Sequence, residues 1–380
     1  MVIPTIPVLS VHFHVSPGVA AQIVTAFALG RFSGTAMSGI ILDHLGARAS
    51  LIAGTATAAV AALSCLATPW FGLLLGLIFI IGVGDSLWLL GLEIVGIDLV
   101  RQDQRGRVIS GFHGMTNGGL TLGPLLGGVL TEVVGFKTVF LGYAVCACVG
   151  LVFGIFPRTV RSWQKPSHPT TLQRAFGIKE SLSSFRVLFK RIEPHLRPTY
   201  LVLVVATTTS IMFRLTTQSM LPVYAGSYLG FSPAEVGLLF SISGVFIFAM
   251  ILPAGFILDK IGRKWATVPS TGLPAFVFLL IPLSDSFLEL TVLASLIGMS
   301  FGLSLGCIAT STYDVVPGAV RGRLQAIRRT VAEVGGIGGP MVAGYLANTF
   351  NPGVPFLVYA PLLLSSALLL AFVGRETLIK

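Results

Sequence analysis

A few ionisable side chains interrupt long apolar stretches of this sequence. Three carboxyl groups, those of Asp85, Glu93 and Glu333, and two guanidinium groups, those of Arg31 and Arg214, lie inside such stretches. A charged side chain in the hydrocarbon core of a membrane is expensive, so it usually pairs with an opposite charge or serves a function. Carboxyl groups there can bind and release protons, and guanidinium groups can hold anions. These residues therefore indicate proton and ion binding.

Arg31 and Asp85 lie at a similar depth. Arg31 precedes Asp43, and Asp85 precedes Asp98, by nearly the same stretch of sequence, which places both about 18–20 Å from the membrane edge at the helical rise of about 1.5 Å per residue. We expect the two to form an ion pair, with either a structural role or a role in substrate contact. Because an arginine partner keeps an aspartate charged, Asp85 is a proton carrier only if transport separates the pair.

Glu333 and Glu93 are the other candidates for proton coupling. Glu333 lies deep in its apolar stretch, well past Arg321, and shares a helical face with Arg329, which occupies the i−4 position. Its carboxyl group either binds and releases protons or reaches toward Arg329. Glu93 lies close to Asp98, where its side chain can reach water at the interface.

The elements that carry these residues are predicted to be membrane-spanning helices. Hydrophobic residues make up 54% of the 380 residues and charged residues only 11%, which is unlike a soluble domain. This composition predicts an all-α membrane protein with eleven complete transmembrane helices. Stretches long enough to cross a hydrocarbon core of about 30 Å lie at 17–41, 49–67, 71–97, 108–131, 136–156, 199–222, 232–258, 265–284, 288–311, 324–347 and 355–374.

The sequence contains an internal repeat. Asp43 corresponds to Asp259, and we call the constant difference between these two positions the repeat offset. The same offset, without gaps, aligns Ser16 with Ser232, Asp98 with Asp314, Arg105 with Arg321, and Pro124 with Pro340. We therefore expect two structurally equivalent halves, an N-terminal bundle at 1–156 and a C-terminal bundle at 199–380, joined by a linker at 157–198.

The two halves differ at their beginnings. Under the repeat offset, the partner of the stretch at 199–222 would begin before Met1, and only Pro4 to Pro7 match the segment around Pro222. We therefore expect the first helix of the first half to be largely absent from this sequence. The segment from Met1 to Pro7 also lacks the basic region and the cleavage site of a signal peptide.

The basic residues follow an alternating pattern along the chain. The net charge of +10 could suggest nucleic-acid binding, but Lys and Arg gather in every second connection, including 157–198 and 321–329, while the other connections carry only Lys137. The positive-inside rule places the basic connections in the cytoplasm. We expect a multi-pass protein of the cell membrane with a cytoplasmic linker, a cytoplasmic C-terminus and no nucleic-acid partner.

A turn motif occurs once in each half. Two glycines, an aspartate between them and a following basic residue recur at Gly39, Asp43, Gly46 and Arg48, and at Gly255, Asp259, Gly262, Arg263 and Lys264. Glycine permits a tight turn, and the carboxylate can pair with the basic residue and cap the next helix. The motif resembles the signature of the major facilitator superfamily, which implies two pseudo-symmetric six-helix bundles with a cytoplasmic gate at this turn. The first copy departs from the signature at His44 and Ala47, so we expect a weaker latch there.

A glycine-rich motif lies in the segment that corresponds to the fifth helix of the family. It comprises Gly119, Gly123, Pro124, Gly127 and Gly128 and resembles a motif of the family's proton-coupled exporters. Glycines at these spacings also let a neighbouring helix approach closely, and proline kinks the helix. A similar set recurs in the second half around Pro340, so export and simple helix packing both remain as interpretations.

The family layout implies a central substrate cavity. Arg214 would lie in the seventh helix, about 10 Å from its outer end, where it meets either an anionic substrate or the outer interface. The other cavity candidates are Arg31, Gln218, Trp88, Asn117, Ser300 and Ser304. Family exporters commonly carry an arginine in the fourth helix, but Ile78 occupies that position here. Proton coupling through that arginine is therefore not implied.

The sequence favours a secondary transporter over an enzyme. No phosphate-binding loop, metalloprotease motif or cofactor motif is present in it, so we expect no catalytic residue, cofactor or metal. The favoured function is proton-coupled efflux, by antiport, of hydrophobic or drug-like small molecules by a monomer in the lipid bilayer. Two alternatives remain open: symport of a small anionic metabolite, anchored by Arg31 and Arg214, and a membrane fragment that does not transport.

Overall fold

The computed structural model describes residues 1–98, 105–155, 187–304 and 306–377, and these residues form helices and no strand. The first half consists of a short 3-10 turn, Ile3–Thr5, followed by α1 (Ile6–His12), α2 (Pro17–Ala20), α3 (Gln22–Cys65), α4 (Phe71–Asp98), α5 (Arg105–Val133) and α6 (Lys137–Ile155). The second half consists of α8 (Arg197–Pro222), α9 (Pro233–Phe256), α10 (Arg263–Leu280), α11 (Phe287–Ser304), α12 (Cys307–Val315), α13 (Arg321–Thr349) and α14 (Val354–Phe372), with π-helical turns at Val223–Tyr228 and Ile257–Ile261.

Helix α3 is two membrane spans joined by a sharp bend. Gly46 has φ 86° and ψ 170° inside the continuous helix assignment, a backbone conformation that residues with a Cβ rarely adopt. The bend separates a first arm that carries Arg31 from a second arm that ends at Cys65. The equivalent glycine of the second half, Gly262, has φ 154° and separates α9 from α10. The predicted tight turns are therefore present in both copies.

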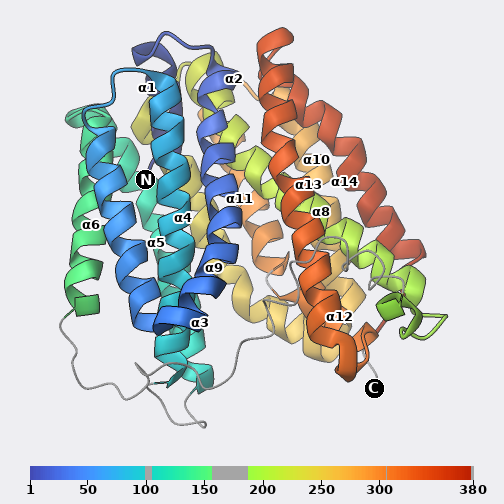
Figure 1. Ribbon diagram of the computed structural model, residues 1–380. Coiled ribbons are helices and arrows are strands. Elements are labelled where there is room, and N and C mark those ends of the chain that lie inside the picture. Colours follow the sequence, from blue (N-terminus) through green and yellow to red (C-terminus); the bar gives the residue numbers. More distant parts are fainter. Residues whose placement is uncertain (99–104, 156–186, 305, 378–380) are drawn as a thin grey trace.

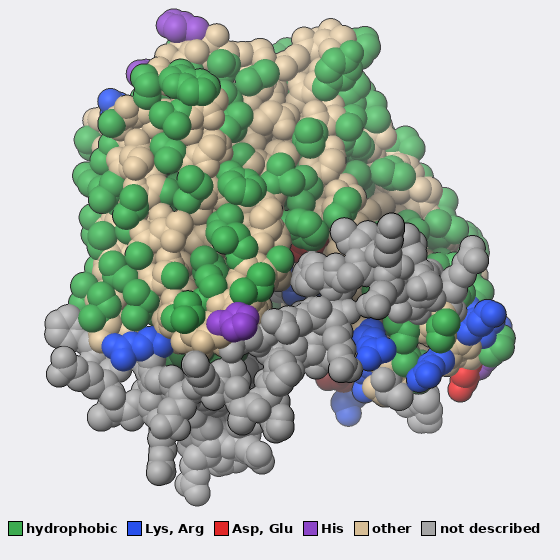
Figure 2. All heavy atoms as spheres, in the orientation of Figure 1, with side chains coloured by type: hydrophobic (Ala, Val, Ile, Leu, Met, Phe, Trp, Pro, Cys, Tyr) green, Lys and Arg blue, Asp and Glu red, His purple; other side chains and the backbone are tan. Residues whose placement is uncertain are grey.

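Eight helices within the described residues are long and apolar enough to cross a membrane. Three further long segments, the first arm of α3, α5 and α13, are not among these eight because they are richer in glycine and polar side chains. The side chains that face outward include large apolar groups such as Phe153, Leu252 and Phe372, which are 72–83% exposed. Figure 2 shows a broad band of hydrophobic and uncharged surface, with most charged side chains near one end. This arrangement matches a protein surrounded by lipid.

The repeat offset relates the helices of the two halves. Adding it to the bounds of α5, Arg105–Val133, gives those of α13, Arg321–Thr349, residue for residue. It also carries α4 onto α11 and α12, and α6 onto α14 to within one position. The short α1 corresponds to the π-helical turn Val223–Tyr228 that follows α8. The two halves thus share one order of elements, as the repeat predicts.

The segment before α2 packs deep in the protein. Thr5, Ile6 and Leu9 are fully buried, and the backbone of Met1 lies against Gly127 of α5. The 3-10 turn and α1 contact α8, and the 3-10 turn also contacts α5 and α9. Pro4 to Pro7, which align with the segment around Pro222 at the end of α8, are therefore helical and lie among α5, α8 and α9.

The helices form two bundles that lie side by side (Figure 1), with α3 to α6 in one and α8 to α14 in the other. Helix α5 packs against α9, and α13 packs against α2 and the first arm of α3. These two contacts are related by the repeat offset. We call the end with Gly46 and Gly262 the motif end, and the end with Pro17 and Pro233 the opposite end.

The bundles are joined in the half nearer the opposite end. Among the described residues, four hydrogen bonds cross between the bundles, and all four lie in that half: from Gly18 N to Asn348 Oδ1 at 2.9 Å, from Gln22 Nε2 to the Pro340 carbonyl at 3.2 Å, from Leu125 N to Ser241 Oγ at 3.2 Å, and from Ala234 N to Glu132 Oε2 at 3.0 Å. The structure is therefore closed at the opposite end.

Candidate functional site

Close packing of α3 against α4 positions the first charged pair. A Cβ added at Gly30 would strike the carbonyl oxygen of Phe79, and one added at Gly82 would lie 3.0 Å from the Arg31 backbone nitrogen. The two helix backbones therefore touch at this level, which is possible only because both positions lack a side chain. This contact places Arg31 opposite Asp85.

The expected ion pair between Arg31 and Asp85 is present. Arg31 Nε lies 3.2 Å from Asp85 Oδ2, and the two side chains are 41% and 25% exposed. Beside the pair, the hydroxyl groups of Thr35 and Ser86 lie 3.0 Å apart and link the same two helices. Tyr143 of α6 interacts electrostatically with both charges. The first bundle thus presents a solvent-accessible ion pair within its membrane span.

The second bundle contributes a second charged group. Glu333 Oε1 lies 3.8 Å from Arg329 Nε on α13, and the side chains are 27% and 76% exposed, so Glu333 has the cationic neighbour that its sequence position predicts. Arg214 on α8 is exposed and interacts electrostatically with Arg31, Glu333 and Arg329. Charges from both bundles therefore meet between them. We call Arg31, Asp85, Arg214, Arg329 and Glu333 the central charged cluster.

The other residues predicted for this region differ in their exposure and in their hydrogen bonds. Gln218, one turn after Arg214 and thus on the same face of α8, is half-buried, as are Trp88 and Asn117. Glu93 is exposed near the motif end of α4. The Ser304 hydroxyl donates a hydrogen bond to the Phe301 carbonyl of its own helix at 2.8 Å.

The prediction that Ser300 lines a cavity is wrong. Its side chain is 1% exposed, and its hydroxyl donates a hydrogen bond to the Ser270 carbonyl at 2.9 Å. Ser300 thus joins α11 to α10 inside the second bundle. Position in the family layout cannot distinguish such an inter-helix hydroxyl from one that faces a cavity.

Sequence reasoning missed a buried arginine, Arg328. The charge pattern groups it with the exposed loop residues at 321–329, but its side chain is only 7% exposed. Its guanidinium donates to Gln325 Oε1 at 2.9 and 3.1 Å and to Thr207 Oγ1 of α8. Adjacent residues of a helix point about 100° apart, so Arg328 and Arg329 in the same helix must face different surroundings. The adjacency of Arg328 and Arg329 in the sequence is therefore the signal that indicates a buried arginine here.

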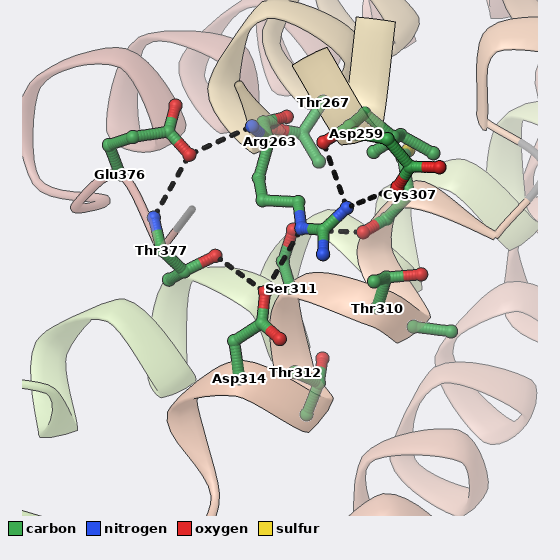
Figure 3. Close-up of polar contacts among 12 residues, drawn as sticks. Asp259, Arg263, Thr267, Cys307, Thr310, Ser311, Thr312, Asp314, Glu376 and Thr377 are labelled. Atoms are coloured by element: carbon green, nitrogen blue, oxygen red, sulfur yellow. Dashed lines mark hydrogen bonds and ion pairs between the residues drawn. The ribbon is translucent and has the colours of Figure 1, made fainter. Parts of the chain in front are cut away.

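The second copy of the turn motif forms a polar network at the motif end (Figure 3). Arg263 binds Asp259 Oδ1 at 3.2 Å, Asp314 Oδ2 at 3.0 Å and the Leu258 carbonyl at 2.8 Å. The expected pairing of Asp259 with the basic residue is therefore present. Asp314 comes from α12, so Arg263 ties that helix to the α9–α10 turn.

The expectation that Asp259 caps the next helix is wrong. The first backbone amides of α10, those of Arg263 and Lys264, donate to the two carboxylate oxygens of Glu376 at 2.8 and 3.1 Å. Glu376 follows α14, its carboxylate lies against Gly262, and Figure 3 shows it bonded to the backbone of Arg263. Thr377 adds a hydrogen bond to Asp314 Oδ2 at 3.1 Å. The C-terminal segment therefore completes this turn, and Lys264 Nζ binds the Ala371 carbonyl at 2.6 Å.

The first copy of the motif is tied down differently. Arg48 donates a hydrogen bond to the carbonyl of Ile155 at the end of α6, at 2.5 Å. Gly39 is half-buried within the first arm of α3 and Gly255 is half-buried in α9. The side chain of Asp43 lies outside the described residues. In both copies the basic residue thus anchors the turn to a helix of its own bundle.

The glycine-rich motif of α5 packs against two partners. A Cβ at Gly128 would strike the Pro233 carbonyl of α9, and the Pro124 carbonyl faces Gly237 of α9. Gly123 and Gly127 face Met1, whereas Gly119 has open space around it. The motif is therefore a packing surface in this conformation, and it forms part of the interface between the bundles.

No group of three potential metal ligands occurs within the described parts of the chain. The polar groups that the fold brings together in the membrane span are charges and hydroxyls suited to binding ions and small polar molecules. Their arrangement between two repeated bundles is typical of secondary transporters.

The family model described as Major Facilitator Superfamily matches residues 1–227 and 203–380. The chain belongs to the major facilitator superfamily. It is accordingly a multi-pass, all-α membrane protein. Solved structures of the superfamily have the same fold: a peptide transporter POT in complex with sulfate superimposes with a TM-score of 0.79 at 16% identity, covering 98% of this chain and 92% of that one. A POT family transporter in complex with 5-aminolevulinic acid superimposes with a TM-score of 0.80 at 13% identity, covering 97% and 91%.

Relatives in the superfamily include proteins named for multidrug resistance. The chain is 27% identical over 258 residues to the multidrug resistance protein MdtG of Dickeya zeae, which is 66% of this chain and 59% of that protein. It is 25% identical over 246 residues to the multi-drug resistance efflux pump PmrA of Streptococcus pneumoniae, 63% and 56%. It is 25% identical over 264 residues to the uncharacterized MFS-type transporter YuxJ of Bacillus subtilis, 68% and 63%. The matches span less than two thirds of each of these relatives.

Proposed function

We propose that this superfamily member is a secondary active transporter that moves small molecules by alternating access. The observation that carries the proposal is the central charged cluster. The members of the cluster come from both bundles and are accessible to solvent. Between the cluster and the opposite end, hydrogen bonds join the two bundles. A rocking motion that opens this end and closes the motif end would expose the same residues to the other side of the membrane.

We propose further that transport is proton-coupled efflux of hydrophobic or drug-like compounds. The names of the MdtG and PmrA relatives support export, and the chain carries two carboxyl groups, Asp85 and Glu333, inside the cluster. Each is paired with an arginine in this conformation. Protonation of either carboxyl group would release its arginine, which couples proton uptake to a change in the charges between the bundles. Glu93, exposed near the motif end, is the third coupling candidate.

The distribution of Lys and Arg supports a proposal for the membrane orientation. Lys and Arg gather at the motif end, so we propose that this end faces the cytoplasm of the cell membrane and that the C-terminus lies there as well. The closed opposite end then faces outward. We propose that the protein acts as a monomer, with the lipid bilayer and a small-molecule substrate as its partners and the division at 1–156, 157–198 and 199–380 as its domains.

A second candidate function is symport of a small anionic metabolite into the cell. The observation that favours it is the excess of arginine in the central charged cluster, where three guanidinium groups face two carboxyl groups. The third hypothesis, a membrane fragment without transport activity, predicts no substrate movement in any direction.

Proton movement in energised, inside-out vesicles distinguishes these functions. A pH-sensitive dye reports proton release when a substrate is added, and a panel of lipophilic cations and small organic anions serves as the substrate set. Proton release on adding panel compounds that requires Asp85 or Glu333 supports proton-coupled export. No response from vesicles that contain folded protein, with any compound, contradicts transport.

A further inference from the structure

The charges between the bundles do not balance. Arg31, Arg214 and Arg329 are cations, and Asp85 and Glu333 are anions, so the central charged cluster carries one excess positive charge. Each carboxyl group already has an arginine within 3.8 Å. Within the described residues, Arg214 makes no ion pair and no hydrogen bond, although its side chain is exposed.

The excess charge lies about midway between the two ends of the bundles. Arg214 lies about four turns before the end of the helical stretch at Tyr228, and Arg31 lies about four turns after its start at Pro17, so both are about 21 Å from the opposite end. Gln22 itself binds the Pro340 carbonyl across the interface at this end. A molecule that enters from the motif end would therefore meet Arg31 and Arg214 before it reaches this hydrogen bond.

Arg31 and Arg214 belong to different bundles, but their helices α3 and α8 contact each other, and the two guanidinium groups repel each other. A negative group between them would turn this repulsion into two attractions and would draw the bundles together. Arginine suits this role because its planar fork of donors matches a carboxylate or sulfonate. The Arg31 guanidinium also lies 6.0 Å from the ring of Phe27, which provides an aromatic surface beside it.

From this arrangement we propose that the chain binds organic monoanions, whose carboxylate or sulfonate group lies between Arg31 and Arg214. The inference rests on the proposed transport function and specifies the substrate class of the same site. One negative charge neutralises the cluster, whereas a second would exceed its positive charge. A monoanion is therefore preferred over a dianion of the same aromatic body and over a cation of that body. Gln218, one turn from Arg214 on the same face of α8, supplies an amide for a further hydrogen bond.

Equilibrium binding to the full chain in uncharged phosphatidylcholine nanodiscs tests this assignment. Three naphthalene probes of matched shape serve as ligands: 2-naphthalenesulfonate, 2,6-naphthalenedisulfonate and naphthylmethylammonium. We expect the monosulfonate to bind at least tenfold more tightly than the ammonium compound and more tightly than the disulfonate. A tenfold difference corresponds to about 1.4 kcal/mol.

Variants show whether Arg214 is responsible for the preference. We expect Arg214→Gln to weaken monosulfonate binding about tenfold or more and to leave ammonium binding equal or improved, whereas Arg214→Lys retains most of the affinity. Arg375→Gln is the matched control, because it removes one exposed arginine after α14, away from the cluster. Size-exclusion profiles and helical circular dichroism of each variant report folding.

Two results would overturn the assignment. One is equal binding of monosulfonate and ammonium probes, or no measurable monosulfonate binding, by the folded wild-type protein. The other is unchanged monosulfonate affinity in folded Arg214→Gln. Neither result removes the transport proposal, because proton movement driven by cationic compounds in vesicles would still establish transport. Conversely, monosulfonate binding without any substrate-driven proton movement would contradict coupled transport and leave the anion site intact.

Discussion

Glu132 of α5 accepts a hydrogen bond from the backbone amide of Ala234, the second residue of α9, at 3.0 Å. A carboxylate of one bundle thus occupies the N-terminus of a helix in the other, where the helix dipole and free amides favour negative charge. The same helix end has its own cap, since Ser232 and Glu235 form a capping box within the second bundle. Helix α9 therefore begins with two acidic groups, of which only Glu132 crosses the interface.

We predict that Glu132→Ala shifts the protein toward a state that is open at the opposite end. Loss of a helix cap costs about 1 kcal/mol, which corresponds to a roughly fivefold change in the ratio of the two states. Spin labels at Val134 and Tyr228, both exposed at this end, report the separation of the bundles by pulsed electron resonance. Glu235→Ala is the control, because its cap lies within one bundle and its loss should leave the distance distribution unchanged. An identical shift in both variants would contradict a latch role for Glu132.

The contact of α3 with α4 predicts a stability difference between two glycines. Gly30→Ala places a methyl group against the Phe79 backbone, whereas Gly76→Ala on α4 meets no atom within 4 Å. Overpacking of this kind costs roughly 1–3 kcal/mol. We expect Gly30→Ala to lower the thermal unfolding temperature in detergent and Gly76→Ala to leave it nearly unchanged. Equal unfolding temperatures would show that the two helix backbones do not touch at Gly30.

The ion pair of Arg31 and Asp85 predicts a non-additive mutational pattern. Asp85→Asn leaves Arg31 without its carboxylate partner, and the expected cost lies between the ~1 kcal/mol of an exposed pair and the ~3–5 kcal/mol of a fully buried one. Replacing both residues, by Arg31→Gln and Asp85→Asn together, removes both charges and should recover part of the lost stability. Unfolding temperatures of the three variants measure the coupling. Additive losses would indicate that the two side chains do not interact.

Proton coupling through Glu333 predicts a change in pH dependence. Glu333→Gln cannot take up a proton, so substrate-driven proton release should fall and transport should lose its dependence on pH, while Arg329 stays in place. Arg329→Gln removes the partner of Glu333 but leaves its carboxyl group able to titrate. Transport assays across a pH series in proteoliposomes compare the two variants. A normal pH profile in Glu333→Gln would assign coupling to another carboxyl group, with Asp85 as the next candidate.

The network around Arg263 predicts that the C-terminal segment stabilises the motif-end turn. Glu376→Ala removes the acceptor of the first two amides of α10. We therefore expect the amides of Arg263 and Lys264 to exchange hydrogen roughly fivefold faster, because the loss of a helix cap costs about 1 kcal/mol. Hydrogen-exchange mass spectrometry of the peptide that contains this turn measures the effect. Glu193→Ala, an exposed acidic residue elsewhere at the motif end, should change nothing there.

Patterns that depend on position along one helix were predictable from the sequence. The repeat offset stays constant along the chain because each half must keep the same helix lengths and turns to pack into the same bundle. Depth estimates from helical rise placed Arg31 beside Asp85, and the i−4 spacing placed Arg329 beside Glu333. These predictions needed only regular helix geometry and the high cost of charge in a membrane.

Contacts between distant segments were not predictable in this way. Glu376 lies 113 residues from Arg263, and Glu132 lies 102 residues from Ala234. No spacing rule connects such pairs, because their proximity depends on how whole helices are placed. The burial of Ser300 and Arg328 was missed for the same reason: a helical face is defined by its neighbours. One sequence gives the composition of a face but not what covers it.

Accessibility of one engineered cysteine tests alternating access most directly. The chain has four free cysteines, Cys65, Cys146, Cys148 and Cys307, which are first replaced by serine or alanine. Gln218→Cys then places one thiol beside Arg214, and Val134→Cys marks the opposite end as a control. A membrane-impermeant maleimide is applied from each side in turn, with and without a proton gradient.

Without a gradient, we predict that the thiol at position 218 reacts only from the motif-end side, because hydrogen bonds between the bundles close the opposite end. With the gradient imposed and acid at the opposite end, reactivity should fall on the motif-end side and rise on the opposite side, while Val134→Cys reacts from the opposite side throughout. Reaction of position 218 from both sides at once, or from one side under every condition, would contradict alternating access.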